Sequence, residues 1–168
     1  MKNIKKKILG YKTTFYIIKI NHKYKCTNKL KINNKYKLFR NKLIKKIKIK
    51  KYLLNNKILV QKIYKNNKMI ENIKNIINHS ITYNYCLYKN KLVLINRNNF
   101  FSKHSIMCNK NPCCSGEMVF YKNSLVFNNN SGTYAPTYDD IKILKKALPF
   151  LKVKVVDMNS KLNKKYFG

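Results

Sequence analysis

The chain has 168 residues, 45% of them hydrophobic, which is enough for one domain with a buried core and excludes a chain that is disordered by composition. It carries 38 Lys and Arg against 5 Asp and Glu, a formal net charge of +33. Such an excess attracts polyanions, but the abundance of Lys, Asn and Ile is also what AT-rich coding sequence produces, so binding and coding bias both stay open. Arg occurs only at Arg40 and Arg97, which argues against sequence-specific reading of DNA bases.

Residues 1–80 are expected to form a Lys-rich basic region with strands and a short helix. Apolar residues alternate with Lys over 46–50, which predicts a strand with one buried face, although 43–54 also fits a basic helix. Over 69–79, isoleucines recur at helical spacing. None of the acidic residues lies before Glu71. We expect this region to contact a polyanion without sequence specificity through Lys45, Lys46, Lys48, Lys50 and Lys51.

Tyrosines are interleaved with lysines in this region, as in Lys23-Tyr24-Lys25. Proteins that bind single-stranded nucleic acid combine aromatic rings, on which bases stack, with cations that follow the phosphates. The alternative is that Tyr, like Lys and Ile, has AT-rich codons and fits strands well. The pattern therefore permits a nucleic-acid partner and does not require one.

Residues 81–160 are expected to form a compact α+β module. Two β-prone runs, 83–88 and 92–95, flank a short polar turn, and each such pair predicts a hairpin. The runs 117–121 and 125–127 flank a second turn in the same way. A mostly antiparallel sheet of hairpins follows from this arrangement.

One helix and a last strand are predicted after the hairpins. Thr137 and Asp140 have the spacing of a capping box, so we expect a helix over 138–148. A strand over 153–156 follows, and 161–168 is expected to be a tail. The fold class is therefore α+β: a mostly antiparallel sheet of hairpins with one or two packed helices, and a basic N-terminal region.

The five cysteines are odd in number and unevenly spaced, which fits reduced thiols in an intracellular compartment better than a disulfide framework. No run approaches the ~18 consecutive apolar residues of a membrane span, so no transmembrane segment is expected. The charged start is followed by a stretch that Lys12 and Lys19 interrupt, without a small-residue cleavage site. We therefore expect no secretory signal and an intracellular protein.

Four residues of zinc-binding type, His104, Cys108, Cys113 and Cys114, lie within eleven residues of one another. Ordinary zinc sites use two pairs of closely spaced cysteines, and no second pair exists, so these residues are only a weak candidate for a metal site. Small buried side chains, or a Cys–His nucleophile pair, are the alternatives. The four glycines are dispersed, which excludes a glycine-rich phosphate loop, and no cofactor is expected.

A motif links the hairpins to the helix: His104-Ser105, then Ser115-Gly116-Glu117, then Asn130-Ser131-Gly132-Thr133-Tyr134 with Pro136. In this pattern the stretch from 83 to about 157 resembles an α+β module of proteins from large nucleocytoplasmic DNA viruses and some microbes. The family more often has His at the position of Thr133 and Ala at that of Ser115. Because no activity is settled for the module, the resemblance carries no catalytic role to these residues.

The Ser131-Gly132-x-Tyr134-x-Pro136 element is expected to form a corner between a hairpin and a helix. Gly132 would supply the turn, Tyr134 would pack on the sheet, and Pro136 would fix the entry into the helix. In the alternative interpretation, His104, Glu117 and Tyr134 converge in one pocket as catalytic residues.

The sequence favours a non-catalytic binding or structural protein. If it is viral, it would be a virion- or nucleoid-associated factor in the host cytoplasm or the virion. Its basic half would contact nucleic acid or another polyanion, and its α+β module would offer a surface to a protein partner. The alternative is a small enzyme or effector with a site at 104–117 beside 131–136. A membrane-surface protein ranks last, because it needs an amphipathic helix where the sequence alternates like strands.

Overall fold

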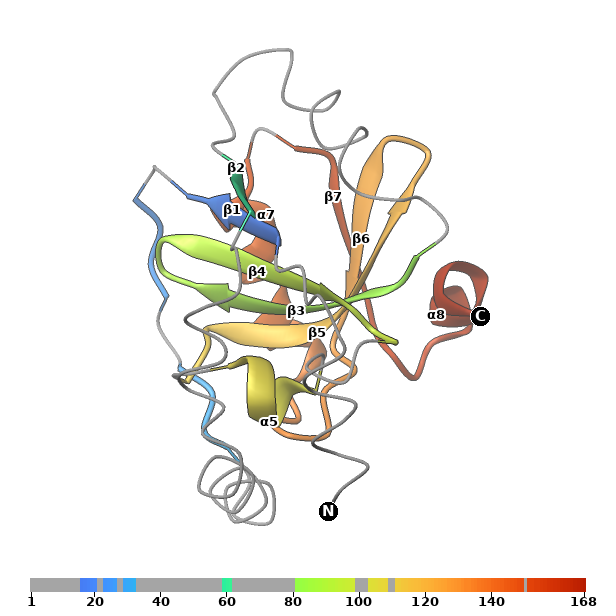
Figure 1. Ribbon diagram of the computed structural model, residues 1–168. Coiled ribbons are helices and arrows are strands. Elements are labelled where there is room, and N and C mark those ends of the chain that lie inside the picture. The colour runs from blue at the N-terminus through green and yellow to red at the C-terminus, as the bar shows by residue number, and fades with distance from the viewer. Residues whose placement is uncertain are drawn as a thin grey trace, which may run out of the picture.

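The computed structural model describes residues 16–20, 23–26, 29–32, 59–61, 81–98, 103–108, 111–149 and 151–168. These residues form one mixed, mostly antiparallel sheet with short helices, so the predicted α+β class is confirmed (Figure 1). The described strands are β1 (Tyr16–Lys19), β2 (Leu59–Gln61), β3 (Tyr83–Tyr88), β4 (Lys91–Asn96), β5 (Cys114–Tyr121), β6 (Ser124–Asn128) and β7 (Val153–Val156). Their order in the sheet is β2-β1-β4-β3-β5-β6-β7, with parallel pairs only at its two edges.

Both predicted hairpins are present. β3 pairs with β4 and β5 pairs with β6, each antiparallel. The second hairpin turns at Lys122 and Asn123, whose φ angles are 45° and 64°. Two successive residues with positive φ match the right-handed twist of the strands they join, and Asn adopts this conformation readily.

One face of the sheet carries the main hydrophobic core. Side chains alternate along each strand, so Tyr85 and Leu87 of β3 lie on the same face as Met118 of β5 and Phe127 of β6. Helices α6 (Tyr138–Ile141) and α7 (Ile143–Ala147) contribute residues to this core. The members of the core that are completely buried and largest are Tyr85, Phe127, Leu87, Leu92, Leu94, Met118, Leu125, Ile141 and Leu144.

The predicted helix over 138–148 begins as expected but is split into two. The Thr137 hydroxyl accepts a hydrogen bond from the Asp140 amide at 3.2 Å, and an Asp140 carboxylate oxygen accepts from the Thr137 amide at 2.7 Å, which confirms the capping box. The break lies at Lys142, whose amide donates to the Asp139 carbonyl three residues back. Such a bond tightens the chain into a 3₁₀ turn.

The other face of the sheet is covered by helix α8 (Lys161–Phe167) and carries the short helix α5 (His104–Met107). Tyr166 and Phe167 of α8 pack on a small cluster of valines in β5, β6 and β7. Residues 161–168 were expected to be a tail and instead form this helix. Ser160 begins it by accepting a hydrogen bond from the Asn163 amide at 3.3 Å.

Two described strands from residues 1–80, β1 and β2, belong to the same sheet as the α+β module. β1 pairs with β4, and Leu30 donates a backbone hydrogen bond to Pro112 at 2.8 Å. Lys45, Lys46, Lys48, Lys50 and Lys51, proposed from the sequence to contact polyanions, lie outside the described residues, as does the predicted helix over 69–79.

Four of the five cysteines form two disulfides, Cys26–Cys113 and Cys86–Cys108. Their Cα atoms are 5.8 and 6.4 Å apart, within the range that a disulfide spans. The expectation of reduced thiols is therefore wrong. It rested on the odd number and uneven spacing of the cysteines, and neither property tells which cysteines approach one another in the fold.

Of the described helices, none has the length and apolar character needed to cross a membrane.

Candidate functional site

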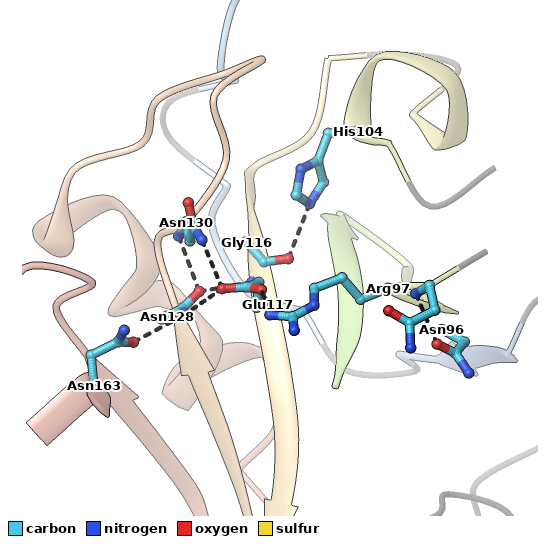
Figure 2. A network of polar contacts seen from close by, with 9 residues as sticks. Asn96, Arg97, His104, Gly116, Glu117, Asn128, Asn130 and Asn163 are labelled. Carbon is cyan, nitrogen blue, oxygen red and sulfur yellow. Dashed lines mark hydrogen bonds and ion pairs between the residues drawn. The ribbon is translucent and has the colours of Figure 1, made fainter. Parts of the chain in front are cut away.

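The buried carboxylate of Glu117 in β5 is the centre of the network of polar contacts shown in Figure 2. Its side chain is only 6% exposed. Arg97 donates from Nη1 to Oε2 at 2.8 Å, while Asn128 and Asn130 donate from their Nδ2 atoms to Oε1 at 3.1 and 2.8 Å. Both carboxylate oxygens are therefore occupied by donors from this chain.

The strands place these partners around Glu117. Register β5–β6 puts Asn128, the last residue of β6, opposite Glu117 on the face away from the main core. Arg97 directly follows β4, where the Asn96 side-chain oxygen accepts a hydrogen bond from the Asn98 amide at 3.0 Å. The Arg97 amide also donates to the Thr82 carbonyl at 2.9 Å, so the backbone that carries the guanidinium is held at the end of the β3–β4 hairpin.

Asn128 connects the carboxylate to the rest of the fold. Its Oδ1 accepts from the amides of Glu117 and Asn130 at 2.9 and 3.0 Å, and its Nδ2 also donates to Asn163 of α8 at 2.9 Å. The Asn128 backbone oxygen accepts from the Tyr85 hydroxyl at 2.9 Å. A fully buried amide with all of its polar groups bonded stabilises one arrangement of β5, β6 and α8.

Glu117 is ionised at neutral pH. Burial raises its pKa, but hydrogen bonds from Arg97, Asn128 and Asn130, together with the charge of Arg97, outweigh the burial and leave the pKa below its ordinary value. Because this pKa is lowered in the folded state, the stability that the carboxylate contributes is present above about pH 4.5 and is lost as the pH falls through the lowered value. A general acid needs the opposite shift, a pKa raised toward neutrality.

His104 lies next to the Glu117 network, beside Gly116, and is also buried (Figure 2). Its Nε2 is 3.0 Å from the Gly116 carbonyl oxygen. Burial lowers the pKa of His104 to about 4, although hydrogen bonds to the carbonyls of Gly116 and Tyr85 and the charge of Glu117 oppose that shift. At neutral pH the ring is therefore neutral, with an Nε2–H that donates to Gly116.

We expect this histidine to make the protein less stable as the pH falls from 6.5 to about 4. In that interval the unfolded chain binds a proton that the folded chain excludes, so stability is present above pH 6.5 and is lost below it. The loss between pH 7 and pH 5 should be roughly 2 kcal/mol. Urea unfolding at a series of pH values measures it.

The matched control for that titration is His104→Gln, which keeps a side-chain donor for the Gly116 carbonyl but does not titrate. The variant should show a nearly flat stability between pH 7 and pH 5. An equal slope in the variant and the wild type would assign the pH dependence to other groups.

The free cysteine, Cys114, lies on the opposite face of β5 from Glu117 and is buried in the main core. Burial raises the pKa of its thiol well above the usual range, against a hydrogen bond with Tyr85 and with a further contribution from Asp140. A thiol in this environment is not the thiolate that nucleophilic catalysis requires. The Cys–His nucleophile pair is therefore not assembled here.

The candidate metal ligands are also dispersed. Cys108 and Cys113 are bonded to different cysteines, and Cys114 faces the core. Within the residues that the structure describes, no group of three or more His, Cys, Asp and Glu side chains is placed to hold a metal ion.

The Ser131–Pro136 element forms the predicted corner between the second hairpin and helix α6, but not as expected. The residue with a positive φ is Ala135, at 42°, and not Gly132. The Ala135 amide donates to the Ser131 carbonyl at 2.7 Å, and the Pro136 carbonyl accepts from Asn129 at 3.1 Å. The hydrogen bonds within this loop therefore hold a positive φ at Ala135, a position where the sequence has no glycine.

Tyr134 is buried in this corner, where its amide donates to the Ser131 hydroxyl at 3.4 Å. The described partners of Glu117 are Arg97, Asn128 and Asn130, so Tyr134 is not one of them. The predicted set of His104, Glu117 and Tyr134 is thus brought together in part: Gly116 links the first two, since His104 bonds the carbonyl that precedes the Glu117 amide. The side chain of Ser105 lies outside the described residues.

The tyrosine of Lys23-Tyr24-Lys25 is part of the fold. Its hydroxyl donates to the Tyr88 carbonyl, and burial, with a contribution from Cys114, raises its pKa. Its ring packs against the main core. Tyr24 is therefore tied to β3 by both its ring and its hydroxyl, and the interleaved pattern does not mark a stacking ring here.

In comparisons with known proteins, no family model, no curated protein and no solved structure matches the chain.

Proposed function

We propose that this protein is a non-catalytic binding protein that contacts polyanions, nucleic acid in particular, without sequence specificity. The observation that carries the proposal is that the buried carboxylate is paired with a cation, whereas several exposed lysines lack a carboxylate partner among the described residues. The buried carboxylate of Glu117 is engaged by Arg97, whereas Lys154, Lys161 and Lys164 are exposed without a carboxylate partner among the described residues. Exposed cations without partners are available to phosphates.

The state of the buried polar groups supports a role without catalysis. Both oxygens of Glu117 accept hydrogen bonds from side chains of this chain, and His104 is neutral and bonded to a backbone carbonyl. A general acid or base needs an atom that can reach the substrate and a pKa near the working pH. Here the partners and the pKa shifts favour a network that holds β5 against its neighbours.

A virion setting is part of the proposal. Disulfides persist in oxidising surroundings, which include virion surfaces, and are rare in the cytosol. The sequence suggests two settings, the host cytoplasm and the virion. The disulfides Cys26–Cys113 and Cys86–Cys108 favour the virion. The lysines of 45–51 and a protein partner for the α+β module belong to the same proposal.

The affinity of the full chain for a single-stranded oligonucleotide is expected to fall steeply with salt. Each phosphate that a lysine neutralises releases counterions, so the logarithm of the association constant should fall linearly with the logarithm of the salt concentration, with a slope steeper than about −3. Fluorescence anisotropy with a labelled dT oligonucleotide at several NaCl concentrations measures the slope. Absence of binding at low ionic strength, or an affinity that does not change with salt, would contradict the proposed function.

A further inference from the structure

The outward side of helix α8 carries three lysines. Asn163, Tyr166 and Phe167 face the sheet, where they bond to Asn128 or pack on the valine cluster. At 100° per residue, the opposite side of the helix then holds Lys161, Lys164 and Lys165, all of them exposed. Lys164 and Lys165 are three and four residues after Lys161, so the Cβ atoms of both lie about 6 Å from that of Lys161.

Two tyrosines border these lysines. Tyr166 of α8 and Tyr121 at the end of β5 form an edge-to-face pair, with ring centroids 5.2 Å apart. Lys165 lies over the Tyr166 ring at 5.6 Å, and Lys122, in the β5–β6 turn, lies over the Tyr121 ring at 5.4 Å. Both rings are partly exposed. Two tyrosine rings in contact, each with a lysine over it, thus form a surface built from two separate segments.

The adjacent edge of the sheet extends this positive surface. Lys154 of β7 is exposed and lies beside Val126 in the register, so its side chain is on the face that α8 covers. The nearby carboxylate is that of Asp157, which accepts a hydrogen bond from the Asn159 amide at 3.1 Å before α8 begins. Its single negative charge leaves the surface strongly positive.

We propose that this Lys–Tyr surface, formed by Lys122, Lys154, Lys161, Lys164 and Lys165 with Tyr121 and Tyr166, binds single-stranded nucleic acid. The lysines contact phosphates, and a base stacks on a tyrosine ring after its lysine turns toward the backbone of the strand. The inference rests on the proposed function and names the place and the class of polyanion. No arginine lies on this surface, so binding has no base specificity.

A membrane surface is a poorer partner for the same lysines. A helix that lies on a bilayer inserts its apolar side, and the apolar side of α8 is already packed on the sheet through Tyr166 and Phe167. The exposed large apolar side chains near the lysines are Leu162 and Met158, and two exposed apolar side chains are too few for a membrane-binding patch. The surface thus offers positive charges and aromatic rings, a combination that suits the phosphates and unpaired bases of a single strand.

The test compares two triple variants of the full chain in the salt titration with the dT oligonucleotide. Lys161→Gln/Lys164→Gln/Lys165→Gln removes three charges from the Lys–Tyr surface and should make the log–log slope shallower by about 2. The matched control, Lys142→Gln/Lys145→Gln/Lys146→Gln, removes three charges from α7 and from the residue between α6 and α7, on the opposite face. It should leave the slope within about 0.5 of the wild type.

The aromatic part is tested by Tyr166→Leu against Tyr166→Phe, with circular dichroism to confirm that both are folded. The Phe variant keeps a ring and should bind like the wild type, whereas the Leu variant should bind roughly 5- to 100-fold more weakly. Equal slopes in the two triple variants, equal affinities in the two Tyr166 variants, or tighter binding to duplex DNA or phosphatidylserine vesicles would overturn the inference. If the wild type binds with a steep slope in those cases, the proposed function still stands.

Discussion

Removal of the Cys26–Cys113 disulfide is expected to lower the free energy of unfolding by about 4 to 5 kcal/mol. The two cysteines are 87 residues apart in sequence, so the bond closes a loop that contains β2, β3 and β4 and strongly restricts the unfolded chain. It also fastens residues 23–26 to the start of β5, where the Cys113 amide donates to the Leu87 carbonyl at 2.7 Å. Urea unfolding of Cys26→Ala/Cys113→Ala against the wild type measures the loss.

The second disulfide serves as the matched comparison. Cys86 and Cys108 are 22 residues apart, and the shorter loop predicts a smaller loss, of about 3 kcal/mol, for Cys86→Ala/Cys108→Ala. Alkylation of the unfolded, unreduced protein should label Cys114 alone. Labelling of five thiols would show that neither bond forms, and would restore the expectation of a reduced protein.

Gly116→Ala should be strongly destabilising, with a loss of about 3 kcal/mol. A Cβ at Gly116 would overlap the backbone oxygen of Asn128 and lie 2.9 Å from its carbonyl carbon and 3.1 Å from the Tyr85 ring. Backbone of a buried strand cannot move aside as the end of a flexible side chain does. The Asn128 carbonyl that would be displaced also accepts a hydrogen bond from the Tyr85 hydroxyl, and the Asn128 side chain donates to Glu117. Displacement of Asn128 would therefore disturb the whole network.

Ser115→Ala is the control on the neighbouring residue. The Ser115 hydroxyl is buried and has no hydrogen-bond partner among the described residues, so its removal should change the stability by less than about 1 kcal/mol. Thermal and urea unfolding of the two variants measures the contrast. A Gly116→Ala variant as stable as Ser115→Ala would mean that β5 and β6 do not approach as closely as described.

The hairpins and the helix cap could be predicted because their signals are local. Alternating apolar residues on either side of a polar turn specify the β3–β4 and β5–β6 pairs within about fifteen residues. The capping box of Thr137 and Asp140 needs only four residues. Each of these elements is specified by residues that are close together in the sequence, whatever strands pair with its outer edges later.

The order of the strands and the disulfides could not be predicted, because both depend on contacts between distant segments. Tyr16–Lys19 forms β1, but many strands offer an apolar face, and nothing local selects β4 as its partner. Cys26 likewise carries no mark that pairs it with Cys113. These choices follow from the packing of the whole core.

The sequence analysis identified Glu117 and His104 as candidate site residues, but it did not identify Arg97, Asn128 and Asn130 as the hydrogen-bond partners of Glu117. Ser115, Glu117 and Val119 alternate with core residues along β5, a pattern that usually places a carboxylate in water. Here α5 and α8 lie on that face, so Glu117 is buried and needs donors. Asn128 and Asn130 supply them, although asparagines in a row indicate a turn when only the sequence is considered.

The Glu117 network and the exposed lysines have separate roles in the proposed function: the network stabilises the fold, and the lysines bind the polyanion. The most direct test is the salt titration with the dT oligonucleotide, performed on wild type and Glu117→Gln after urea unfolding of both. The variant should lose about 2 kcal/mol of stability, because the Arg97 hydrogen bond is no longer to a charged group, and should keep the wild-type salt slope and affinity. A folded variant of wild-type stability that no longer binds the oligonucleotide would contradict the claim and assign Glu117 to the binding site.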